Sequence, residues 1–92
     1  MTTQTIFEIQ LGTLDHFLDE IDLALTDRDK FYLQIEAAKI VAHVKPPRPE
    51  FQRDLDYFGL AVFFDETFEA RMAIDRLKRG VFSPLNEFVS VL

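Results

Sequence analysis

The residues best suited to chemistry lie near the start of the chain, where His16 and Glu20 stand four positions apart with Asp19 beside them. On a helix this spacing places an imidazole and a carboxylate on one face, where they could flank a metal ion. The competing interpretation is a solvated, charge-rich helix face, because two such residues often meet this spacing by chance. We adopt the solvated face and expect no metal and no other cofactor.

Groups for nucleophilic or phosphate chemistry are scarce. The chain has no cysteine, and neither Ser83 nor Ser90 stands in the Gly-x-Ser-x-Gly context of a serine nucleophile. Its three glycines are too widely spaced to form a loop that cradles phosphate. We therefore expect a protein that is not an enzyme.

The charge is distributed unevenly along the chain. The net charge is -6 at pH 7, and residues 1–27 contain no lysine or arginine. This balance disfavours binding to nucleic acid or to a membrane surface, because both depend on basic side chains meeting phosphate. An acidic helix can instead dock on a basic surface of a protein partner. The acidic residues that we expect to bind a partner are Asp15, Asp19, Glu20 and Asp22.

Size and composition predict a single domain over residues 1–92. The chain is 48% hydrophobic, and domains commonly hold about 50 to 200 residues. It opens without the basic and apolar regions of a signal peptide, and no apolar run approaches the length that spans a bilayer. Together with the absence of cysteine, these features predict a cytoplasmic protein without a membrane association.

The hydrophobic pattern predicts strands and helices in alternation. Residues 5–11 and 57–64 are apolar runs typical of strands, while the apolar spacing after Thr13 and after Asp65 predicts two helices. Residues 31–45 fit either a strand or a helix, and we interpret them as a strand. A last strand is expected at 88–92. The order predicts an α+β fold, a ferredoxin-like βαββαβ domain with a four-stranded antiparallel sheet and two helices on one face.

Three segments carry a resemblance to a known family. The segment Phe58-Gly59-Leu60-Ala61-Val62-Phe63 resembles the core of the RNP1 motif of RNA recognition motif (RRM) domains, and residues 6–11 and 70–77 are similar to that family's other motif and second helix. The resemblance implies that Phe7 and Phe58 stack on RNA bases from the surface of the sheet. Asp56 stands where the motif has a basic residue, so packing within the fold is the alternative role for both rings.

These observations lead to three functional hypotheses. The first is a small acidic protein-interaction domain, a regulator, adaptor or inhibitor that presents its acidic helix to a basic partner. The second is a divergent RRM-like domain that binds single-stranded RNA. The third is a self-associating structural subunit, a homodimer through the C-terminal edge strand with contacts at Phe88 and Val91, because exposed apolar edges seek partners.

Overall fold

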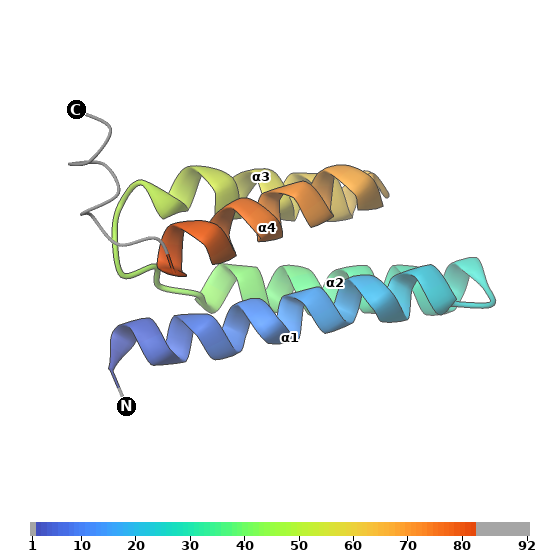
Figure 1. The fold of residues 1–92 in the computed structure, drawn as a ribbon. Helices are drawn as coiled ribbons and strands as arrows, with labels where there is room; N and C mark the ends of the chain where they lie inside the picture. Colours follow the sequence, from blue (N-terminus) through green and yellow to red (C-terminus); the bar gives the residue numbers. More distant parts are fainter. Residues whose placement is uncertain (1, 83–92) are drawn as a thin grey trace.

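The structure, a computed structural model, describes residues 2–82 and contains four α-helices in that part of the chain. Consecutive helices run in opposite directions, as Figure 1 shows. The helices are α1 (Thr3–Leu23), α2 (Asp27–His43), α3 (Phe51–Phe63) and α4 (Thr67–Phe82).

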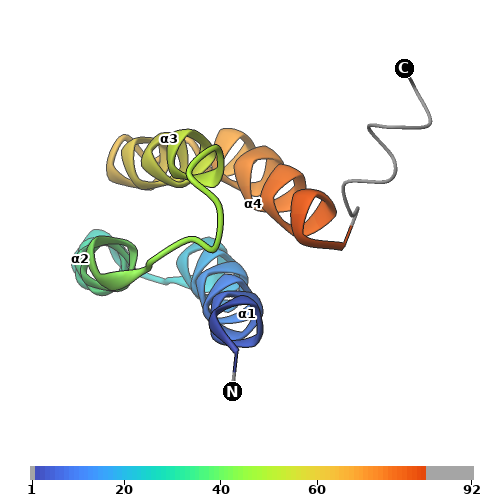
Figure 2. The same cartoon turned by 90° about the vertical axis from the view of Figure 1, so that its left-hand side faces the viewer.

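The helices form an up-and-down four-helix bundle. Each helix packs against its neighbours in the chain, and α4 closes the ring by packing against α1. Viewed from one end, the four helices occupy the corners of a square (Figure 2). Short connections between antiparallel neighbours are typical of this architecture.

The core forms because apolar residues recur at alternating spacings of three and four, which keeps them on the side of each helix that faces the bundle axis. This row is complete on α1, where Phe7 and Leu14 are fully buried. The aromatic rings of Phe7 and Phe51 stack with their centroids 5.6 Å apart, which joins α1 to α3 across the bundle. The buried residues are Phe7, Leu11, Leu14, Leu18, Ile21, Ala37, Val44, Phe51, Leu55, Phe58, Ala61, Val62, Ala70, Ala73, Ile74 and Leu77.

Local hydrogen bonds fix where the helices begin and turn. The hydroxyl of Thr2 accepts from the amide of Thr5, and that of Thr26 accepts from the amide of Asp29, so each threonine caps a helix N-terminus. Asp65 adopts a left-handed conformation (φ 60°) in the turn between α3 and α4, where aspartate is tolerated better than most residues. The Lys30 Nζ lies 3.1 Å from Asp65 Oδ2, which holds this turn against α2.

The predicted ferredoxin-like, RRM-like fold is wrong, because the described part of the chain contains helices and no strand. The run 57–64 belongs mostly to α3. A short continuous apolar run does not distinguish a buried strand from a buried helix by its periodicity. Within this run Phe58 is fully buried, whereas Leu60 is 59% exposed and Phe63 is 70% exposed, as helical rather than alternating burial requires.

The other predicted strands are corrected in the same way. Residues 5–11 lie within α1, where Phe7 and Leu11 point inward while Ile9 remains exposed, and the helix continues through Gly12. Residues 31–45 take the helical alternative over most of their length, as α2. The predicted strand at 88–92 lies outside the described residues. Within residues 2–82, no helix has both the length and the apolar character needed to cross a membrane.

Candidate functional site

The acidic residues of α1 face α4 and are largely paired within the fold. The guanidinium of Arg71 lies 2.7 Å from Asp19 Oδ1 and 2.8 Å from Asp22 Oδ2, and it approaches Asp15 Oδ1 at 3.7 Å. The Lys78 Nζ lies 2.8 Å from the other oxygen of Asp15. The hydrogen bonds that Arg71 donates to Asp22 and Asp19 raise its pKa above the ordinary value. Three of the four acidic residues expected to bind a partner are therefore paired with basic residues of α4.

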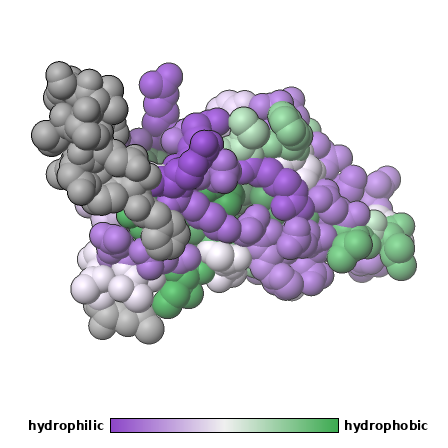
Figure 3. Space-filling view, viewed as in Figure 1, coloured by the Kyte–Doolittle hydropathy of each residue, from purple (hydrophilic) through white to green (hydrophobic). Residues whose placement is uncertain are grey.

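The fourth acidic residue, Glu20, points to solvent beside His16. The His16 Nε2 lies 3.2 Å from Glu20 Oε1, and both side chains are about half exposed or more, at 71% and 49%. Within residues 2–82, no three or more His, Cys, Asp or Glu side chains are grouped so that they could hold a metal ion. Figure 3 shows how hydrophilic side chains cover most of the face formed by α1 and α4.

The sequence-predicted aromatic residues lie in the interior. Phe7 and Phe58 are both 0% exposed in the single core cluster, so neither ring offers a face on which a base could stack. Phe88 and Val91, the expected contacts of an edge strand, lie outside the described residues.

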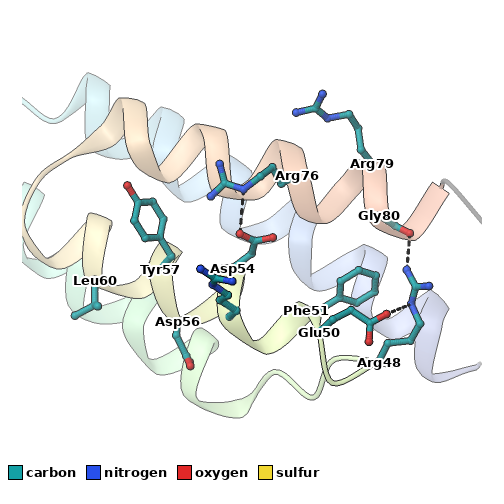
Figure 4. Close-up of a pocket in the computed structure, with 11 residues that line it drawn as sticks. Arg48, Glu50, Phe51, Asp54, Asp56, Tyr57, Leu60, Arg76, Arg79 and Gly80 are labelled. Atoms are coloured by element: carbon teal, nitrogen blue, oxygen red, sulfur yellow. Dashed lines mark hydrogen bonds and ion pairs between the residues drawn. The ribbon is translucent and has the colours of Figure 1, made fainter. Parts of the chain in front are cut away.

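An open groove runs along the outer side of α3 and α4 (Figure 4). Across it, the Arg76 Nε lies 3.0 Å from Asp54 Oδ1, and the hydroxyl of Tyr57 donates to Glu69 Oε2 over 3.2 Å. At one end, Arg48 donates to the carbonyl oxygen of Gly80 over 2.9 Å.

The groove has the contacts of a helix interface. Arg48 also lies 3.3 Å from Glu50 and covers the Phe51 ring at 4.5 Å. Arg79 pairs with Asp75 at 2.8 Å along α4. No polar or charged side chain is buried among the described residues.

The helix α2 carries a second apolar row, which lies outside the core cluster formed by the described residues. Residues Phe31, Ile35, Ala38 and Ala42 are spaced by four, three and four positions, the same spacing as a core row, and all four are exposed. We call these four residues the outer seam. Phe31 is 60% exposed and Ile35 is 39% exposed. A helix that is apolar on two sides is normally covered on both.

The outer seam lies on the side of α2 next to α3. The Gln34 Nε2 donates to the carbonyl oxygen of Val62 over 3.0 Å, which places the end of α3 beside the first half of α2. Gly59 faces Val41, and Phe63, one helical turn further along α3, extends the apolar surface at the Phe31 end. The surface therefore combines two large aromatic rings with a strip of small residues.

Further apolar side chains are exposed at one end of the bundle. Leu23 and Leu25 at the α1–α2 turn are 74% and 94% exposed, and Phe64 and Phe68 at the α3–α4 turn are 64% and 71% exposed. Figure 3 shows hydrophobic atoms at this end, over the α1–α2 turn. Unlike the outer seam, these residues lie at helix ends and in turns, and they do not form one row along a helix.

Sequence reasoning missed the outer seam although a signal for it was present. Two interleaved rows occur along α2 and its C-cap, one at Leu33, Ala37, Ile40 and Val44 and the other at positions 31, 35, 38 and 42. Read together they resemble the alternation of a strand whose phase changes near Ala38. Read separately, each row has the four-three-four spacing of a helix that packs on two sides.

Comparison with known proteins finds no relative of this chain. No family model matches the chain, and no curated protein or solved structure matches it. The class of the molecule is therefore defined by its own fold, an up-and-down four-helix bundle with an uncovered apolar row on α2.

Proposed function

We propose that this chain is a non-enzymatic protein-interaction domain, a small regulator, adaptor or inhibitor, and that it binds through the outer seam. The observation that carries the proposal is the exposure of Phe31, at 60%, within a row that has the spacing of a helix-packing surface. An apolar row of this length in water costs free energy that binding would recover.

The distribution of charge supports the outer seam over the acidic residues of α1 as the binding surface. Asp15, Asp19 and Asp22 would have to give up Arg71 or share it with a partner, which reduces what they contribute to binding. The outer seam has no such competitor among the described residues. The lack of cysteine agrees with a cytoplasmic location, which we include in the proposal.

Affinity capture from an extract of the source cells tests this function. We expect the tagged chain to retain a specific protein and the Ile35→Lys variant to lose most of it, since a charge within an apolar interface must be desolvated without a partner. Glu20→Lys is the control, because it changes the exposed acidic residue and leaves the outer seam intact. If Glu20→Lys loses the captured protein and Ile35→Lys retains it, the partner binds the acidic side of α1 and not the outer seam.

A further inference from the structure

The outer seam changes size from one end to the other. Its first two residues, Phe31 and Ile35, are large, and its last two, Ala38 and Ala42, are small. All four positions are exposed along one side of α2. A partner that fits this surface has small residues opposite the first half of α2 and large residues opposite the second half.

We propose that a second copy of this chain occupies the outer seam, with the two α2 helices packed antiparallel about a two-fold axis. This inference rests on the proposed function and names the partner of that surface. In a two-fold interface, if one residue contacts a second, then the second contacts the first on the other copy. Each of the four outer-seam residues can be paired in this reciprocal way.

The antiparallel arrangement pairs large residues with small ones. Phe31 of each copy lies opposite Ala42 of the other, and Ile35 lies opposite Ala38. The small residues let the two helix backbones approach closely while the large ones fill the space beside them. A parallel arrangement would instead set Phe31 against Phe31 and leave a gap between the alanines at the other end.

The apolar area is of the size that a stable dimer needs. An interface of standard size buries about 800 Å² from each partner, of which roughly 57% is non-polar, or about 450 Å². Phe31 and Phe63 are 60% and 70% exposed, and an aromatic side chain buries about 150 to 250 Å², so these two supply on the order of 250 Å². Ile35, Ala38 and Ala42 add to this area, and all three are exposed.

Sedimentation equilibrium of the purified chain tests the proposal. We expect a mass that rises with concentration toward twice the 10.7 kDa of one chain. Ala38→Glu should raise the dissociation constant by at least about 100-fold, because two carboxylates would meet near the axis without a partner. Ile9→Glu is the control, since Ile9 is 52% exposed on α1 and lies away from the outer seam, and it should leave the dimer unchanged. Circular dichroism verifies that both variants remain helical.

Two results would overturn the proposal. The first is a wild-type mass of one chain at the highest concentration reached, and the second is a dimer that Ala38→Glu leaves intact. In the first case the proposed function can still hold, because capture of a different protein that depends on Ile35 would show a heterologous partner on the same surface. If the capture of a protein from the extract does not depend on Ile35 while the purified chain still forms the dimer, the proposed function is contradicted and the dimer stands.

Discussion

The ring of Phe51 lies in the space that a side chain at Gly80 would occupy. A Cβ built on Gly80 would stand 2.6 Å from Phe51 Cε1 and 3.2 Å from its Cζ. Phe51 also stacks on Phe7, and Arg48 covers the same ring while it donates to the Gly80 carbonyl oxygen. The start of α3, the end of α4 and the first turns of α1 therefore meet at the Phe51 ring. This packing requires a residue without a side chain at position 80.

We expect opposite effects from the same substitution at two glycines. Gly80→Ala should lower the free energy of unfolding by about 0.5 to 2 kcal/mol, because the gain in helix propensity does not offset the overpacking against Phe51. Gly12→Ala should raise it by about 0.5 to 1 kcal/mol, because Gly12 lies inside α1 and alanine restricts the unfolded chain. A Cβ at Gly12 meets nothing within 4 Å. Urea unfolding of both variants measures the difference, and a gain at Gly80 would contradict the packing described here.

Arg71 should matter to stability more than an ordinary surface arginine. Arg71→Gln leaves Asp19 and Asp22 close together without their cation, so we expect a loss of about 1 kcal/mol at low salt. The loss should shrink in high salt, because screening weakens both the ion pairs and the repulsion that replaces them. Arg79→Gln is the matched control. Its pair with Asp75 is more exposed, so its effect should stay within about 0.5 kcal/mol, and an equal effect of both variants would refute the role of Arg71.

The helical phase of residues 57–64 can be tested with two truncations. Phe58→Ala should cost about 3 to 5 kcal/mol, because the ring is fully buried, and Leu60→Ala should cost less than about 0.5 kcal/mol. In a strand, positions 58 and 60 would share one face. In α3 they do not, since Phe58 is 0% exposed and Leu60 is 59% exposed. Chemical denaturation distinguishes the two cases, and comparable losses would favour the strand.

The phenol of Tyr57 should titrate above its ordinary value. Its pKa is raised chiefly because neighbouring protein atoms desolvate the phenolate, and next because the hydroxyl donates to Glu69. A pKa raised on folding contributes stability that is present below the unfolded pKa of 10.0 and is lost as pH rises through the folded pKa. The phenolate absorbance of wild type minus that of Tyr57→Phe measures this midpoint. Glu69→Gln should lower it, and a midpoint below 10.0 would contradict the contact.

Part of the fold follows directly from residue spacing. The positions of Leu14, Leu18 and Ile21 predict a helix with one buried side, and all three are buried in α1. The same holds for Ala70, Ala73, Ile74 and Leu77 in α4. Both helices have polar residues on the opposite side, so their helical period is unambiguous.

The rest of the fold was mispredicted for identifiable physical reasons. Gly12 lies on an exposed surface of α1, where a glycine lowers stability without ending the helix. Gly80 lies inside α4, where Phe51 requires its small size. In α2 and α3, apolar residues also occupy the side that faces away from the core, where a typical helix has polar residues. In α3 this makes residues 57–64 a continuous apolar run that hides the helical period.

The acidic residues of the candidate site could be identified from the sequence, but their partners could not. The spacing of Asp15, Asp19 and Asp22 places them on one side of a helix. Arg71 and Lys78 are about 50 to 60 positions away in the chain and meet them only because α4 packs against α1. The acidic residues that the sequence suggests as a binding surface are therefore paired with basic residues of the same chain.

In the proposed dimer α2 packs on both sides, inward on the core and outward on a second copy. Disulfide exchange between single-cysteine variants tests the outward packing, because the chain has no cysteine of its own. Ile35→Cys and Ala38→Cys are mixed and equilibrated in a thiol–disulfide buffer. Antiparallel pairing predicts that the mixed disulfide, which joins position 35 of one copy to position 38 of the other, exceeds the half share that random pairing of the two variants gives. A mixed share of one half or less, or no disulfide between chains, would contradict the antiparallel dimer.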